Sequence, residues 1–246
     1  MHVLRKSIHL ALAGLALGLL SAAASFASPL PPGSIFSING WNPGGDALGC
    51  AVDSIDPEVT NCSGTNASPG SGNFTVQSWN LHLDSDPTVT NFFAIQNNLA
   101  TPQTFTITVQ IPTSGTFGPP VTMQGSMGGS ITDTTGNGAT LTSSAPTAIY
   151  QALVDGSPVQ TLLNDPQSFS AGAFGSQTLG PASFGPLSQN IAATTSIGIT
   201  IKFTVSPSDL VSFTSVFTLI PEPGTLALLA GGIAGIAHFG RRRAAA

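Results

Sequence analysis

Apolar and polar residues alternate with a period of two along three stretches of the chain. In 104–111, phenylalanine, isoleucine and valine alternate with threonine and glutamine. Apolar residues also share one face in 197–205 and 211–219, opposite small or polar residues. This alternation is typical of antiparallel strands with one buried face. The pattern predicts a β-strand in each stretch.

Shorter runs of the same kind predict further strands. These are Ile35–Asn39, Phe74–Leu83, Thr90–Gln96, Val121–Met127, Ala148–Val154, Val159–Leu163 and Gly175–Leu179. Turn signals rich in Asp, Asn, Gly and Pro separate them, and no long amphipathic helical pattern intervenes. We therefore predict an all-β fold, an antiparallel β-sandwich of jelly-roll-like type.

Three other stretches shape the expected topology. The turn Ser206–Asp209 between the last two alternating runs predicts a terminal hairpin over 194–219. Repeated Phe-Gly with Ala, Ser and Pro in Ser168–Pro186 predicts a long ordered loop or an irregular sheet edge. Residues 28–72, rich in Gly, Pro, Ser and Asn, are expected to be the least regular.

The N-terminal residues have the pattern of a secretory signal peptide. Arg5 and Lys6 precede an apolar run, Ile8–Leu20, and small residues follow at the positions that a signal peptidase reads. We predict that residues 1–27 are the signal peptide, cut between Ala27 and Ser28. The alternative is an uncleaved anchor, for which the apolar run is short.

The C-terminal residues combine three features in a fixed order. Pro221, Glu222 and Pro223 favour extended backbone, and an uncharged run, Leu226–Phe239, follows them. As a helix this run would span about 21 Å, less than the roughly 30 Å hydrocarbon core of a bilayer. Arg241, Arg242 and Arg243 close the run, and they predict an orientation with the C-terminus in the cytoplasm.

This C-terminal order resembles the PEP-CTERM sorting signal of Gram-negative bacteria. The resemblance covers residues 220–243, and Gly224 departs from the Ser, Thr or Ala common after the second proline. It implies that an exosortase, a membrane-embedded transpeptidase, recognises Pro221–Pro223, and that Arg241–Arg243 act as the stop. The protein would pass to the cell surface or exopolysaccharide matrix after transient membrane insertion. The alternative is an unprocessed C-terminal anchor or a buried terminal helix.

The two ends divide the chain into three parts. Both basic clusters belong on the cytoplasmic side, so the secretion machinery would export everything between them. The expected parts are the signal peptide 1–27, a β-sandwich domain 28–219 and the sorting signal 220–246. The exported part has one basic residue, Lys202, against ten acidic residues. It therefore lacks the basic cluster that nucleic-acid binding requires.

Cys50 and Cys62 are the only cysteines of the chain. Because the chain is exported, we predict a disulfide that braces the irregular N-terminal segment. A metal ligand or a catalytic thiol is the alternative, but the local segment contains no histidine.

His82 and the tryptophans are candidates for chemistry or ligand binding. His82 lies on the polar face of its predicted strand, and the chain lacks the G-x-S-x-G spacing of a serine nucleophile. We expect an exposed strand histidine. Trp41 and Trp79 suit sugar stacking, although Trp79 is in phase with buried residues.

Acidic residues around the cysteines are secondary candidates for calcium binding. They are Asp46, Asp53, Asp56 and Glu58, and their spacing is not that of an EF-hand. Asp is also common in turns, where it binds its own backbone. Nothing in the sequence places two carboxylates across a cleft for glycoside hydrolysis.

Together these patterns predict an exported, surface-sorted protein that is not an enzyme and has no cofactor. We expect a structural or adhesive role in the extracellular polysaccharide or biofilm matrix, a role that comes with the resemblance. A secreted carbohydrate-binding module and an exported hydrolase are the alternatives.

Overall fold

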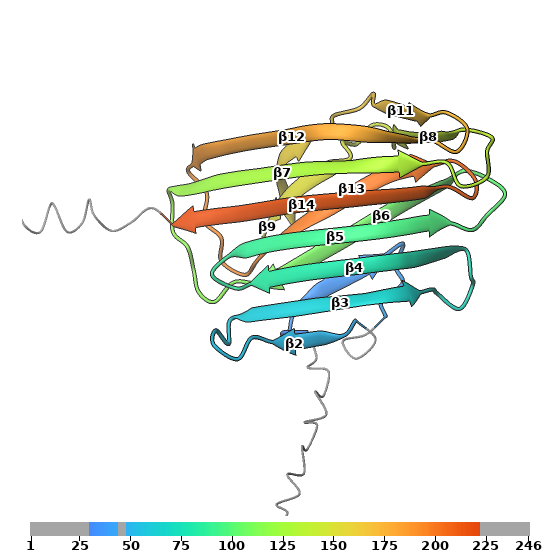
Figure 1. The fold of residues 1–246 in the computed structure, drawn as a ribbon. Helices are drawn as coiled ribbons and strands as arrows, with labels where there is room; N and C mark the ends of the chain where they lie inside the picture. Colours follow the sequence, from blue (N-terminus) through green and yellow to red (C-terminus); the bar gives the residue numbers. More distant parts are fainter. Residues whose placement is uncertain (1–29, 44–47, 222–246) are drawn as a thin grey trace, which may run out of the picture.

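The computed structural model describes residues 30–43 and 48–221, which form two seven-stranded sheets packed face to face (Figure 1). Every pair of neighbouring strands in these residues is antiparallel. The prediction of an all-β, antiparallel sandwich is therefore confirmed.

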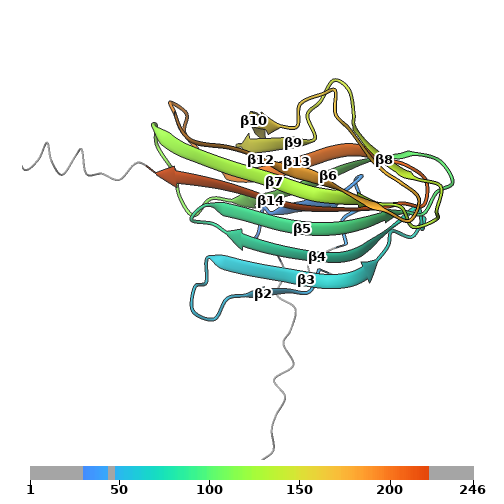
Figure 2. The ribbon, with the colours of Figure 1, turned by 45° about the horizontal axis from the view of Figure 1, so that its top comes forward.

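The front sheet of Figure 1 has the order β12-β7-β14-β5-β4-β3-β2. Its strands are β2 (Cys50–Val52), β3 (Val59–Ala67), β4 (Phe74–Asp84), β5 (Thr88–Asn97), β7 (Val121–Thr132), β12 (Ser176–Gln189) and β14 (Leu210–Pro221). Figures 1 and 2 show that β2 to β5 form a meander and that β14 lies between β5 and β7.

The back sheet contains the order β1-β6-β13-β8-β11, with β9 and β10 continuing it beside β13. Its strands are β1 (Ile35–Ile38), β6 (Gln103–Pro112), β8 (Ala139–Ser143), β9 (Tyr150–Val154), β10 (Ser157–Leu162), β11 (Ser168–Ala171) and β13 (Ser196–Val205). β8 and β9 pair with successive halves of β13, so they share one position in the sheet.

The strand order from β5 onward is that of a jelly roll. In the front sheet this order is β5-β14-β7-β12. In the facing back sheet, β6 is followed by β13, then by β8 and β9, which share one position, and then by β11 beside β8 and β10 beside β9. Thus β5 and β14, far apart in the sequence, lie side by side, as Greek-key connections require. β1 and the β2–β4 meander extend the two sheets beyond this core.

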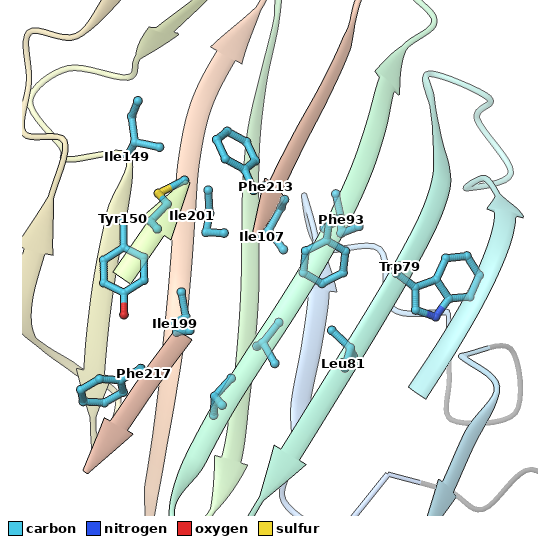
Figure 3. Close-up of a cluster of buried hydrophobic side chains, with 14 of the residues drawn as sticks. Trp79, Leu81, Phe93, Ile107, Ile149, Tyr150, Ile199, Ile201, Phe213 and Phe217 are labelled. Carbon is cyan, nitrogen blue, oxygen red and sulfur yellow. The ribbon is translucent and has the colours of Figure 1, made fainter. Parts of the chain in front are cut away.

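The core lies between the sheets and is filled by the alternating apolar residues. The inward residues of β13, from Ile197 to Val205, are buried, as are those of β14 (Figure 3). Phe203 of the back sheet packs against Phe213 of the front sheet, with ring centroids 4.8 Å apart. Burial of this apolar surface is the main force that holds the sheets together, because each buried large side chain contributes about 1.5–3 kcal/mol.

The predicted terminal hairpin over 194–219 is wrong. β13 pairs with β6, β8 and β9, whereas β14 pairs with β5 and β7 in the other sheet. The turn Ser206–Asp209 instead carries the chain from one sheet to the other. Both strands present an apolar face to the same core from opposite sides, and alternation alone does not separate this arrangement from a hairpin.

Two stretches without clear alternation also form strands. Ser168–Pro186 contains β11 and most of β12, so the prediction of a loop is wrong there. β12 is an edge strand with register shifts at Leu179/Ala182 and Phe184/Leu187, which agrees with the alternative of an irregular edge. The segment 28–72, expected to be least regular, contains β1, β2 and β3.

Several predictions concern residues outside the described ranges. These are the signal peptide, its cleavage between Ala27 and Ser28, Asp46, Glu222, Pro223, the apolar run Leu226–Phe239 and Arg241–Arg243. Within residues 30–43 and 48–221, no helix has the length and apolar character needed to span a membrane.

The cysteines form the predicted disulfide. Cys50 and Cys62 lie opposite each other on β2 and β3, and their sulfur atoms are bonded. The bond closes the β2–β3 hairpin, whose tip is residues 53–58. β2 has only three residues and therefore makes few backbone hydrogen bonds, so the disulfide helps to hold this short edge strand on β3.

We predict that the double substitution Cys50→Ser with Cys62→Ser lowers the free energy of unfolding by about 3 kcal/mol, because the unfolded chain regains loop entropy. Urea denaturation would measure the change. The wild-type protein under reducing conditions is the matched control and should show the same loss. Equal stability of the oxidised and reduced wild type would contradict the prediction.

Candidate functional site

The C-terminal strand leaves the sandwich at one end, which we call the exit end. It is formed by the loops 53–58, 85–87, 113–120, 155–156 and 190–195. β14 pairs with β5 up to Thr218 and with β7 up to Pro221. The Leu219 N–H also donates to the Pro87 carbonyl at 3.1 Å. The extended backbone is therefore held in the sheet up to the first proline of Pro-Glu-Pro.

Backbone hydrogen bonds join the exit-end loops to one another. The Ser85 N–H donates to the Glu58 carbonyl at 3.2 Å, and the Ser114 N–H donates to the Ser85 carbonyl at 3.0 Å. Phe117 and Ala193 exchange two bonds of 2.8 and 3.0 Å. The loops of both sheets thus form a connected surface around the end of β14.

The calcium candidates Asp53, Asp56 and Glu58 lie at the tip of the β2–β3 hairpin, where they do not converge on a site. Asp53 Oδ1 accepts the N–H groups of Ile55 and Asp56, at 2.8 and 3.2 Å, and these bonds lower the pKa of Asp53. Asp56 Oδ1 accepts the Glu58 N–H at 3.0 Å. Among the described residues there is no group of three or more His, Cys, Asp or Glu side chains placed to hold a metal ion.

Asp155 anchors two exit-end loops. Its carboxylate accepts the backbone N–H groups of Thr194, Thr195 and Ser196 and both threonine hydroxyls, at 2.8–3.1 Å. Desolvation opposes ionisation, but these donors outweigh it and hold the pKa of Asp155 well below its ordinary range. The side chain is thus a structural anchor.

Asp133 has the same role at the opposite, distal end, formed by the loops 68–73, 98–102, 133–138, 172–175 and 206–209. Asp133 is 3% exposed, and its carboxylate accepts four backbone N–H groups at 2.8–3.1 Å, those of Thr135, Gly136, Gly138 and Phe174. Although desolvation opposes ionisation, these donors lower the pKa of Asp133. Desolvation instead raises the pKa of the neighbouring buried Asp209.

Asp133 positions an exposed aromatic side chain, which sequence reasoning missed. Phe174 is 76% exposed, and its backbone has a φ of 52° in the left-handed region. The ring packs over Gly136, where an added Cβ would come within 2.3 Å of the Phe174 Cζ atom. The absence of a side chain at Gly136 lets the ring lie in this position. The repeated Phe-Gly pairs in Ser168–Pro186 are the sequence signal that could have pointed to this exposed aromatic side chain.

The tryptophans and His82 have structural surroundings. Trp79 is buried and donates from Nε1 to the Leu48 carbonyl at 2.9 Å. Trp41 is half-buried and makes a T-shaped contact with Phe74, with ring centroids 5.8 Å apart, so part of this indole lies against the core. His82 lies on the outer face of β4, where its Nδ1 is 2.9 Å from the Asn61 Oδ1.

These observations define a class of protein: an all-β sandwich whose last strand continues directly into a C-terminal Pro-Glu-Pro segment. Residues 219–244 match the PEP-CTERM protein-sorting motif. This motif implies a secreted protein that an exosortase processes and that is directed to the cell surface. No curated protein matches the chain. The motif covers the last three residues of β14 and about a tenth of the sequence.

We predict that Asp155→Asn destabilises the sandwich and flattens its acid response. The pKa of Asp155 is depressed in the folded state, so its stabilisation is present above the ordinary value of 3.8 and is lost as the pH falls further. Urea denaturation from about pH 7 to about pH 2.5 measures this. Asp86→Asn, which removes an exit-end charge but none of these bonds, is the control. Parallel curves for wild type and Asp155→Asn would contradict the prediction.

Proposed function

We propose that the protein is a non-enzymatic component of the extracellular polysaccharide matrix, where the sandwich is structural or adhesive. The sorting motif at 219–244 carries this proposal. After export, the apolar run Leu226–Phe239 inserts into the membrane transiently, and exosortase processing passes the domain to the surface.

The outer faces of the sandwich support contact with neutral polysaccharide. On the back sheet, hydroxyls of β6 and β13 pair across the strands: Thr104 with Thr204 at 2.7 Å and Thr108 with Thr200 at 3.3 Å. On the front sheet, Ser130 and Ser212 pair at 2.9 Å. Each hydroxyl both donates and accepts, so these faces offer sugar hydroxyls many neutral partners.

The anchored carboxylates support a non-enzymatic role. General acid–base catalysis needs a carboxylate directed at a substrate. Asp133 and Asp155 instead direct their oxygens at backbone N–H groups of their own loops. Their hydrogen bonds hold the fold at both ends of the sandwich.

We predict that the protein co-fractionates with exopolysaccharide from the native host and is released when that polysaccharide is degraded enzymatically. Glu222→Gln with Pro223→Ala, which alters the motif beyond the end of β14, should leave the protein in the membrane fraction. Fractionation followed by immunoblotting measures both results. Wild-type protein found in the membrane fraction alone would contradict the proposal.

Phe174 favours a second candidate function, binding of neutral carbohydrate. Its ring lies over Gly136, and Asp133 holds its backbone N–H, so little backbone freedom of the loop remains to be lost on binding. Neutral hydrogen-bonding groups lie nearby, since the Thr135 hydroxyl donates to the Asn137 Oδ1 at 2.8 Å. An aromatic face beside neutral polar groups suits a sugar ring.

We predict that Phe174→Ala weakens binding to the neutral fraction of host exopolysaccharide by about tenfold, roughly the loss of one stacking contact of 1–1.5 kcal/mol. Affinity electrophoresis measures this. Ile55→Ala, which removes an exposed apolar side chain at the exit end, is the control and should leave binding unchanged. Equal weakening by both substitutions, or by neither, would contradict the role of Phe174.

A further inference from the structure

The fold and the sorting motif share residues 219–221, so no linker separates them. The motif begins at residue 219, whereas β14 remains paired with β7 up to Pro221. Between Pro221 and the first residue of the apolar run, Leu226, the chain spans at most about 17 Å when fully extended. Any membrane-bound enzyme that binds Pro-Glu-Pro must therefore come into contact with the exit end.

The exit end presents an exposed apolar side chain. Ile55, at the tip of the β2–β3 hairpin, is 92% exposed. The Asp53 carboxylate holds its backbone N–H, and the Cys50–Cys62 disulfide closes the hairpin beneath it. A rigidly presented apolar side chain of this kind suits the centre of a protein–protein contact.

Carboxylates surround this side chain and continue toward the end of β14. Asp53, Asp56 and Glu58 lie beside Ile55, Asp84 ends β4, and Asp86 lies in the β4–β5 turn. The exit-end loops contain no lysine or arginine to balance these charges. A cationic surface is thus the favourable partner, whereas anionic lipid would be repelled within a Debye length of about 8–10 Å.

The spacing of the strands places these groups within one interface. In the front sheet, β5 is the direct neighbour of β14, and β3 and β2 are the third and fourth strands from it. The β4–β5 turn and the tip of the β2–β3 hairpin both lie at the exit end (Figure 1). At about 4.8 Å per strand, the tip is about 14–19 Å from β14. A standard interface of about 800 Å² per partner has a comparable radius of about 16 Å.

We propose that the exit end is a docking face for the processing enzyme, with Ile55 as the apolar anchor and the surrounding carboxylates as the contact for a cationic rim. This inference rests on the proposed exosortase processing and adds a second recognition element to the motif. Docking holds the short segment after Pro221 in the enzyme, and the disulfide keeps the hairpin in position for that contact.

The test measures the rate of tail removal in the native host by pulse labelling and C-terminal mass. Two variants of the full chain, Ile55→Ser and Asp84→Asn with Asp86→Asn, should each be processed at least about threefold more slowly, the effect of weakening a contact by roughly 0.7 kcal/mol. Phe174→Ser, at the distal end, and Asp86→Glu, which keeps its charge, should be processed at the wild-type rate. Thermal unfolding of each purified variant checks that the fold is unchanged.

A flexible insert of about eight Gly and Ser residues between Ile220 and Pro221 keeps Pro-Glu-Pro intact and separates it from the sandwich. With the insert, the motif can reach the enzyme without contact between the enzyme and the sandwich. Ile55→Ser should then leave the rate of tail removal unchanged. Wild-type rates for both exit-end variants without the insert, or slow processing that persists with it, would overturn the docking face. An unprocessed wild type would instead overturn the proposed function. Binding of the wild type, but not Ile55→Ser, to phosphatidylglycerol vesicles would assign the face to lipid and overturn the enzyme contact.

Discussion

The seating of β14 between β5 and β7 is the constraint on which the structure depends. This strand supplies Phe213 and Phe217 to the core, and its Val216 carbonyl accepts the Tyr150 hydroxyl of the back sheet at 3.0 Å. Because β5 and β14 are joined only through long-range pairing, the jelly roll closes when its last strand is in place. The same strand begins the sorting motif, so completion of the fold and presentation of the motif occur at the same residues.

Scarcity of charge explains how the loops are held. Lys202 is the one lysine or arginine of the described ranges, so Lys and Arg ion pairs do not brace the ends of the sandwich. Carboxylates bound by backbone N–H groups replace them, with Asp133 at the distal end and Asp155 at the exit end. Such bonds to a charged acceptor are stronger than neutral ones. They leave neutral hydroxyls on the outer faces of the sandwich, which suits the proposed contact with polysaccharide.

Sequence reasoning predicted the fold class because alternation reports which face of a strand is buried, as in β6 and β13. It failed where a strand lacks the alternation, and where two successive strands with the same alternation belong to different sheets. β3 has many small and polar residues on an exposed edge region, and β12 is broken by two register shifts. The misplaced hairpin at Ser206–Asp209 shows that a turn between two amphipathic strands does not decide which sheet each strand joins. Likewise, the sequence predicted the Cys50–Cys62 bond but could not show that Gly136 seats the ring of Phe174, a contact set by distant backbone.

The most direct test of the account is the C-terminal mass of the protein recovered from its native host. Processing at the sorting motif predicts a surface or matrix form that ends near Pro-Glu-Pro and lacks Arg241–Arg243. A mass that includes Ala246, found with the membrane fraction, would show that the tail is a permanent anchor and would contradict the central claim.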